Sequence, residues 1–395
     1  MRLSLIEAER DINKPPTSDW FDRSTKRFFC PSLSLINIAS QTPRTVKMKL
    51  VDEKFETVDW GDLPDIAAIS YKTMSVKRAY ELADIYKTKG TKVILGGPHA
   101  SLMPQEAKMH CHSVVTGEGE EIWPQVIDDL NKNRLQDFYR APRLVDIAGI
   151  NLSRHDLLNN ESYVFHSIQT SRGCSLGCDF CPTREMFGGV FRTKPVHKVI
   201  REIKHALSVE KKRIFFVDDI FCAGNETFML DLLKKIRRLR IRFYAISDFL
   251  VLNNNLVTEL AKSGCHCLCL NIPGTCRPED EKLIDALQAA GINVWGYFMF
   301  GFPSHGPDIF EKAHDLIGRT KMRHASFTVM APYPNTKMGI SLAGQGRILS
   351  EDWSLYDQTN VIYKPDKMGP QELEKGFKWI KEKLGRLSYH DSKRE

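Results

Sequence analysis

The sequence predicts an α/β protein made of an amino-terminal doubly wound sheet, a partial (β/α)6 barrel and a small mixed carboxyl-terminal tail. Two observations support this fold class: strands alternate with amphipathic helices from about residue 46 to 130, and the alternation resumes from 166 to 335. Strands that alternate with helices favour parallel sheets covered by helices. The length of 395 residues and the 42% hydrophobic content suit two domains, each with its own core.

The first domain is expected at 1–135. Its predicted elements are strands at 46–53, 65–71, 92–97 and from 113 onward, with helices at 76–90 and 123–130. Two of these strands run directly into glycine turns, GGPHAS at 96–101 and GEGE at 117–120. Ligands of such sheets bind beyond the carboxyl ends of the strands, so both turns are predicted to border a binding site.

The second domain is expected at 166–335, after a linker at 136–165 and before a mixed tail at 336–395. Its six predicted strands lie at 167–171, 213–219, 242–248, 265–272, 293–301 and 325–333. The helices between them are predicted at 196–207, 227–239, 256–264, 279–291 and 308–318, and the tail ends with a helix near 370–386. Such β/α units in series form a barrel whose site lies at the carboxyl ends of its strands.

The charge distribution indicates whether nucleic acids or membranes are expected as partners. The formal net charge of +7 is a small excess for this length, and the basic runs at 234–242 and 378–386 are interpreted as solvated helix faces. We therefore expect no specific nucleic acid partner, while a peripheral contact with an anionic membrane stays open. No apolar run approaches the ~18–20 residues that span a bilayer, and the amino terminus does not resemble a signal peptide, so the protein is expected in the cytoplasm.

Three of the ten cysteines form the strongest motif, TSRGCSLGCDFCP at 170–182. Grouped cysteines in a reducing compartment indicate metal or redox chemistry. Cys174, Cys178 and Cys181 follow a predicted strand, and their spacing lets a short loop bring three thiolates to three corners of an iron–sulfur cube. The loop offers no fourth ligand, which leaves one iron open. The alternatives are a zinc site, which would want a fourth cysteine or histidine, and three buried core cysteines, which the polar residues between the thiols disfavour.

This Cys-x3-Cys-x-aromatic-Cys motif, with Phe180 as the aromatic residue, resembles that of the radical S-adenosylmethionine superfamily. The β/α units that follow resemble the partial barrel of the same superfamily. The resemblance implies that S-adenosylmethionine binds the open iron of a [4Fe–4S] cluster, beside Phe180. An electron from the cluster then splits the bound molecule into methionine and a 5′-deoxyadenosyl radical. It also implies an external electron donor of the flavodoxin or ferredoxin type.

Further contacts with S-adenosylmethionine follow from the same resemblance. Asp218 and Asp219, in FVDDIF, stand where polar residues of the family meet the methionine amine, and carboxylates suit an ammonium group. A helix N-cap is the alternative role for these residues. Gly301, in GYFMFGFP, stands at the turn after the adenine-contacting strand. The family often has a Glu-Ser pair near the ribose, whereas this chain has NIPGT at 271–275, which offers no carboxylate.

The first domain, together with RILSEDWSLYD at 347–357, resembles the cobalamin-binding branch of the superfamily. The resemblance implies that the sheet holds a corrinoid whose nucleotide tail is buried beside the glycine turns. The matching positions are Gly96, Gly97, His99, Ser101, Gly117, Glu118 and Gly119. The chain lacks the Asp-x-His-x2-Gly motif that supplies an imidazole to cobalt in some other cobalamin proteins, so His99 is interpreted mainly as a polar loop residue. A domain that no longer binds cobalamin is the alternative.

The other cysteines do not predict a second cluster. Cys265, Cys267 and Cys269 alternate along a predicted strand and are interpreted as buried small side chains that share one face. The related methylthiotransferases would need three more cysteines upstream of the motif, where this chain has only Cys30 and Cys111.

The sequence thus predicts a cobalamin-dependent radical enzyme that transfers a methyl group to an unactivated carbon of a small-molecule, lipid or peptide substrate. Two alternatives stay open: radical C–C coupling or ring closure on a lipid-like substrate, and a module that holds corrinoid or cluster without turnover. No side chain is assigned a catalytic role, because the cofactors carry such chemistry while the protein positions them and excludes water.

Overall fold

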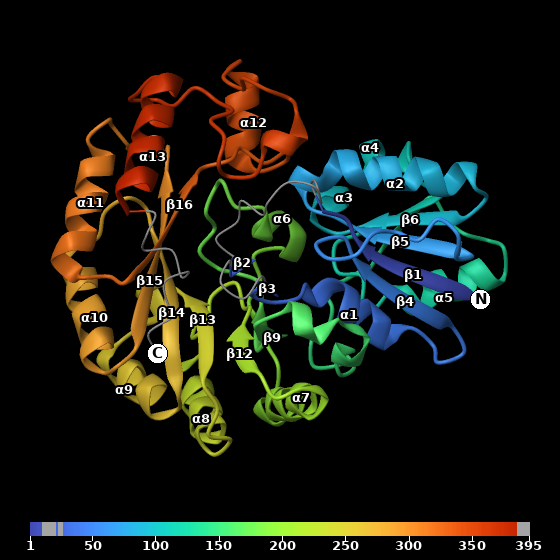
Figure 1. The fold of residues 1–395 in the computed structure, drawn as a ribbon, viewed down its shortest axis with the longest axis horizontal. Coiled ribbons are helices and arrows are strands. Elements are labelled where there is room, and N and C mark those ends of the chain that lie inside the picture. Colours follow the sequence, from blue (N-terminus) through green and yellow to red (C-terminus); the bar gives the residue numbers. More distant parts are fainter. Residues whose placement is uncertain (10–20, 23–26, 385–395) are drawn as a thin grey trace.

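The computed structural model describes residues 1–9, 21–22 and 27–384 and contains two α/β domains side by side (Figure 1). The first domain is built on a parallel sheet with the strand order β4-β1-β5-β6-β7-β8. The strands are β1 (Arg2–Glu7), β4 (Lys47–Asp52), β5 (Ile66–Ser70), β6 (Lys92–Gly96), β7 (Ser113–Thr116) and β8 (Phe138–Arg140). Helices cover both faces, so the predicted doubly wound domain is confirmed.

The two helical layers explain the burial pattern of this sheet. One face carries α2 (Val76–Thr88), α3 (Pro98–Leu102) and α4 (Pro104–Lys108), and the other carries α1 (Leu33–Gln41) and α5 (Trp123–Asn131). Strand β5, with the sequence IAAIS, is buried at every position because apolar helix faces pack on both of its sides.

The second domain is a curved parallel sheet with helices on its outer side (Figure 1). The strand order is β16-β15-β14-β13-β12-β9, an open partial barrel as predicted. Its strands are β9 (Phe165–Ile168), β12 (Arg213–Phe216), β13 (Phe243–Ser247), β14 (Cys265–Ile272), β15 (Asn293–Phe300) and β16 (His324–Val329). Its helices are α7 (Val196–Val209), α8 (Glu226–Arg237), α9 (Asn254–Lys262), α10 (Pro278–Ala289) and α11 (Ile309–Thr320).

A segment from the first half of the chain covers the free edge of this barrel. The backbone N–H groups of Val164 and Phe165 donate to the carbonyls of Phe28 and Phe29, at 2.9 and 2.7 Å. The Phe29 ring enters the barrel interior, where it packs edge-on against Phe165 and Trp295. The open edge of β9 is therefore shielded from unwanted strand pairing.

Short elements and the tail complete the fold. They are the antiparallel pairs β2 (Phe21–Asp22) with β3 (Arg27–Phe28) and β10 (Ser171–Arg172) with β11 (Arg192–Thr193), and helices α6 (Thr183–Phe187), α12 (Lys337–Gly344) and α13 (Pro370–Leu384). Helix α13 packs on β16 and α11. The tail also reaches the first domain, since Trp353 Nε1 donates to Glu106 Oε2 at 3.3 Å.

Three features differ from the sequence-based expectations. Strand β1 was not expected, and β8 lies inside the range 136–165 expected as a linker. The prediction that the three cysteines of β14 share one face is wrong for Cys265. A shift of register between β13 and β14 places Cys265 in the outer core, while Cys267 and Cys269 face the barrel interior. All three are buried, as expected.

Within the described ranges, no helix combines the length and apolar character needed to cross a bilayer.

Candidate functional site

The segment before the first motif cysteine is held by the carboxyl end of β12. Asp218 is 1% exposed, and its carboxylate accepts hydrogen bonds from the backbone N–H and the hydroxyl of both Thr170 and Ser171. Burial raises the pKa of Asp218 to about 6, against the effect of these hydrogen bonds. Asp218 therefore holds in place Thr170 and Ser171, the residues that lead into the cysteine loop.

Asp219 lies one residue further on and is only partly buried. Its Oδ2 accepts the backbone N–H of Gly173 at 2.8 Å, and its Oδ1 lies 3.4 Å from Thr183 Oγ1. Burial raises the pKa of this carboxyl group above its ordinary value. The N-cap role considered for the two aspartates is wrong, because α8 is capped by Asn225, whose side chain accepts the N–H of Phe228.

The three motif cysteines lie on one loop between β10 and α6. Cys178 is exposed and the other two are partly buried, and burial raises the pKa of Cys174 and Cys178. Across the described part of the chain, no three histidine, cysteine or acidic side chains converge tightly enough for a single metal ion. The zinc alternative therefore gains no support, whereas thiolates that bind different irons of a cube stand further apart than ligands of one ion.

Neighbouring elements brace the same loop. The Phe180 ring packs edge-on against Phe302 at 5.0 Å between centroids. The backbone N–H of Met338, in the first turn of α12, donates to the carbonyl of Asp179 at 3.0 Å. The tail thus supports the cysteine loop, a role that sequence reasoning did not assign to it.

Gly301 follows the last residue of β15, with a φ of 93°. Its carbonyl accepts a hydrogen bond from the Tyr363 hydroxyl, and a side chain at this position would collide with that hydroxyl. The turn therefore requires glycine, and Tyr363 of the tail holds it in place.

A cavity of about 280 Å³ lies between helix α1 and the carboxyl ends of the strands of the first sheet. Its floor and roof are apolar and consist of Leu5, Leu35, Ile38, Ala68, Ile94, Val115 and Trp123. Five of the seven predicted corrinoid residues line it, namely Gly96, Gly97, Gly117, Glu118 and Gly119. On the barrel side the lining continues with Gln169, Arg172, Met186 and Phe187. The cavity therefore opens from the glycine turns toward the cysteine loop.

The other two predicted residues do not line the cavity. Ser101 ties the two glycine turns together, because its hydroxyl donates to the Gly97 carbonyl at 2.9 Å and accepts the Gly117 N–H at 2.8 Å. His99 is fully buried, with Nδ1 3.2 Å from Thr73 Oγ1 and Nε2 3.5 Å from Glu106 Oε1. The structure therefore does not support direct contact between His99 and a ligand in the cavity.

The residues around the cavity fit a corrinoid nucleotide tail. An apolar slot with a polar rim suits a flat base that carries a charged and hydroxylated chain. At Gly97 a Cβ atom would come within 2.9 Å of Ser70 Oγ and of the Tyr71 backbone, and at Gly119 within 3.0 Å of Ile38 Cδ1. Glu7 also lines the cavity, is 5% exposed, and has a buried Oε2 without a hydrogen-bond partner among the described residues. An unpaired buried polar atom of this kind indicates a place for a ligand.

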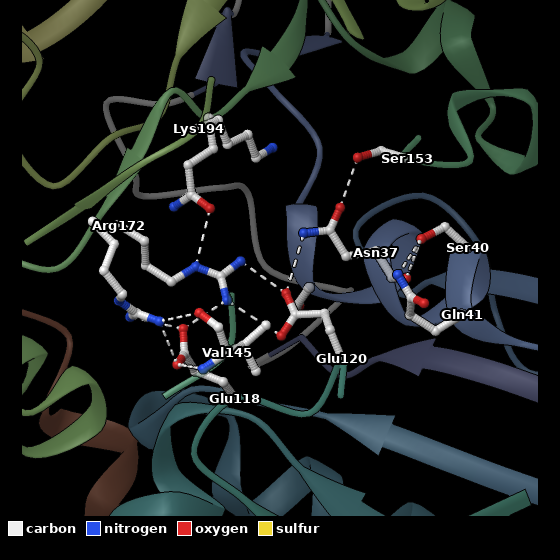
Figure 2. A network of polar contacts seen from close by, with 12 residues as sticks. Asn37, Ser40, Gln41, Glu118, Glu120, Val145, Ser153, Arg172 and Lys194 are labelled. Carbon is white, nitrogen blue, oxygen red and sulfur yellow. Dashed lines mark hydrogen bonds and ion pairs between the residues drawn. The ribbon is translucent and has the colours of Figure 1, made fainter. Parts of the chain in front are cut away.

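Glu118 has a role that the resemblance did not imply. Its carboxylate pairs with Arg172 at 2.9 Å and Arg192 at 2.8 Å, and it accepts the Val145 N–H at 2.9 Å (Figure 2). Glu120 pairs with Arg172 at 2.8 Å. We call Arg172, Arg192, Glu118 and Glu120 the arginine–glutamate network; sequence reasoning missed both arginines and Glu120. The only local signals were the arginine directly before the cysteine loop and the second acidic residue of GEGE.

Together the fold and this site define a class: a protein with a doubly wound corrinoid-type domain joined to a partial barrel with a three-cysteine loop. Residues 61–127 match the B12 binding domain family, and residues 168–296 match the Radical SAM superfamily. The chain is therefore a radical S-adenosylmethionine enzyme with a B12-binding domain, homologous to the cobalamin-dependent radical S-adenosylmethionine methyltransferases.

Individual relatives agree with this family. Bacteriochlorophyllide d C-12(1)-methyltransferase of Chlorobaculum tepidum is 27% identical over 369 residues, which cover 87% of this chain and 80% of that protein. Hopanoid C-2 methylase of Rhodopseudomonas palustris is 21% identical, over 82% of this chain and 66% of that protein. The structure of the methyltransferase TsrM from Kitasatospora setae, with cobalamin and a [4Fe–4S] cluster bound, has a TM-score of 0.71 at 15% identity and covers 98% of this chain and 88% of that one. This last likeness shows a shared fold over nearly the whole chain.

Proposed function

We propose that this enzyme transfers a methyl group to an unactivated carbon of a small-molecule or lipid substrate. The observation that carries the proposal is the continuity of the cavity. It begins between α1 and the glycine turns and ends at Arg172, two residues before Cys174. A corrinoid held in the first domain would therefore face the loop that holds the cluster, which is the arrangement that methyl transfer to a substrate radical requires.

The chain's own residues bind and orient in this proposal. Cys174, Cys178 and Cys181 hold the cluster, Asp219 receives the ammonium group of S-adenosylmethionine, and Gly301 borders its adenine. When bound, the cluster with S-adenosylmethionine supplies a carbon-centred radical, and cobalamin supplies the methyl group. Phe180 and Phe302, whose rings pack edge-on, would limit the access of water to the loop on one side.

The substrate class is proposed from the relatives. Their names include a methyltransferase of bacteriochlorophyllide d and a methylase of hopanoid, so a small-molecule or lipid substrate with an unactivated carbon is the class we favour. An external electron donor of the flavodoxin or ferredoxin type and a cytoplasmic location belong to the same proposal.

The products of S-adenosylmethionine test the proposal. Methyl transfer through cobalamin consumes one molecule to give S-adenosylhomocysteine and a second to give 5′-deoxyadenosine. We expect anaerobic, reduced enzyme to form both, with S-adenosylhomocysteine appearing only when hydroxocobalamin has been loaded. Deoxyadenosine alone from loaded enzyme would instead favour radical coupling or ring closure. The absence of both products, from protein that holds four irons and one corrinoid, would favour a module without turnover.

A further inference from the structure

The arginine–glutamate network runs from the cavity to the residues just before the cysteine loop, and Figure 2 shows its polar contacts. The side chains of Glu118, Glu120 and Arg172 are 2, 8 and 7% exposed, and that of Arg192 is 16% exposed. The group contains two carboxylates and two guanidinium groups, so its charge balances. Burial alone would lower the pKa of Arg172, but the carboxylates of Glu120 and Glu118 raise it, and Arg172 lowers the pKa of Glu120 against the effect of burial. Arg172 and Glu120 therefore form a charged pair in the folded protein.

One end of the network reaches the helix that roofs the cavity. Asn37, on α1, is 2% exposed and donates from Nδ2 to Glu120 Oε1 at 3.3 Å. Its Oδ1 accepts the Ser153 hydroxyl at 2.6 Å. Leu35 and Ile38, on either side of Asn37, line the cavity. The position of α1 over the cavity is thus tied to Glu120.

The other end reaches the cysteine loop. Arg172 and Arg192 are paired residues of the antiparallel ribbon β10–β11, and both guanidinium groups contact Glu118. Gly173, the next residue, has its N–H held by Asp219 at 2.8 Å. Cys174 follows directly. A displacement of Arg172 would therefore move the start of the cysteine loop and the carboxylate that we assign to S-adenosylmethionine.

We propose that this network couples the two sites thermodynamically, so that a corrinoid in the cavity tightens S-adenosylmethionine binding at the cysteine loop, and the reverse. The inference rests on the proposed function. Its physical basis is that breaking one buried ion pair leaves an uncompensated charge on the partner, so the pairs of the network form or break together. Ordering α1 at one end of the network therefore also orders Arg172 at the other end. When one ligand orders a shared element, a second ligand that needs the same element ordered loses less conformational entropy on binding. Such coupling is reciprocal between the two ligands.

Calorimetric titration of S-adenosylmethionine tests the coupling without turnover. The protein carries its oxidised cluster, no reductant is present, and each variant is titrated with and without bound hydroxocobalamin. We expect the wild type to bind at least about 5-fold more tightly when cobalamin is loaded, the lower end of the usual range of allosteric coupling. In Glu120→Gln, which has nearly the same shape but no charge, we expect the ratio of the two affinities to fall to about 1, so that coupling is lost.

The matched control is Glu121→Gln, the neighbouring carboxylate. Its side chain is 38% exposed and pairs with exposed Arg143 at 3.3 Å, so the ratio should equal that of the wild type. Within the network, Asn37→Ala removes only the contact with α1, so it should also lower the ratio of the two affinities. This variant replaces Glu120→Gln in the test if Glu120→Gln does not retain its cluster.

The possible outcomes separate the two proposals. Wild-type protein that retains no cobalamin would overturn the proposed function. Wild-type protein that binds both ligands with a ratio near 1, or variants at Glu120 and Asn37 that keep the full ratio, would overturn the coupling alone.

Discussion

Replacing Asp219 by Asn is expected to weaken S-adenosylmethionine binding while leaving the cluster in place. The Asp219 carboxylate is partly exposed beside the cysteine loop, and its one short hydrogen bond is to the backbone N–H of Gly173, at 2.8 Å. An Asn side chain can still accept that N–H through its Oδ1, so the substitution removes the negative charge and little else. The loop should therefore keep its shape.

The size of the effect follows from the interaction that is lost. A hydrogen bond between a carboxylate and an ammonium group contributes about 1.5–3 kcal/mol. At about 1.4 kcal/mol per tenfold change, the dissociation constant should rise about 10- to 150-fold. Iron content should stay at the wild-type level. Anaerobic calorimetry with the oxidised cluster measures the affinity, and iron and sulfide analysis measures the cluster.

Asp218→Asn is the matched control, because Asp218 makes its contacts inside the protein. Its carboxylate accepts four hydrogen bonds from Thr170 and Ser171, and an amide would present a donor among these donors. We expect a loss of about 1–3 kcal/mol of stability with near-normal affinity. Normal affinity in Asp219→Asn would refute the assignment of the ammonium site, as would an equal loss of affinity in a stable Asp218→Asn protein.

Three further predictions follow from other parts of the site. Burial raises the pKa of Asp218 from 3.8 to about 6, so the folded state holds a proton that the unfolded state releases at lower pH. Between pH 4 and 7 the wild type should therefore lose about 2.5 kcal/mol of stability relative to Asp218→Asn, measured from the difference in their thermal midpoints. Gly119→Leu should abolish retention of cobalamin on gel filtration, because even a Cβ atom there comes within 3.0 Å of Ile38 in the cavity roof; an unchanged cobalamin content would contradict the site. Single alanine variants of the proposed cluster ligands should lose iron and all cleavage of S-adenosylmethionine, whereas Cys267→Ala, in the barrel interior, should keep both. The ligand variants are those at Cys174, Cys178 and Cys181.

The regular elements were largely predictable because their burial is periodic along the chain. Helix α2 and the barrel strands begin and end within a few residues of the predicted limits, since apolar residues recur at helix or strand spacing. Strand β1 was missed because it stands at the amino terminus and is buried on both faces, so it shows no alternation. Strand β8 has three residues, FYR, of which only Tyr139 is buried, and such a length carries no pattern.

Within the site, local motifs were predictable and long-range pairings were not. The cysteine loop depends on spacings of a few residues, and its position after a strand could be seen in the sequence. Arg172 pairs with carboxylates 54 and 52 positions away, and Arg192 pairs with one 74 positions away. Nothing in a single sequence shows which of its 56 basic and 49 acidic residues meet in the folded chain. Glu118 was therefore assigned to the ligand because of its turn, although its carboxylate is taken up by two arginines.

The alternative of a first domain that has lost its ligand conflicts with the packing of α1. A helix with the sequence LSLINIASQ would bury its apolar side chains directly on the sheet if nothing had to lie between them, because protein interiors are close-packed. Leu35 and Ala39 do share a core with the sheet, but Leu35 and Ile38 also border a cavity, opposite Ala68 and Ile94 of the sheet. The helix is held over that space by polar contacts at Asn37 rather than by apolar packing alone. A cavity of this kind would cost stability if no ligand filled it. Its retention, together with a buried Glu7 oxygen that has no hydrogen-bond partner among the described residues, favours a domain that still binds its ligand.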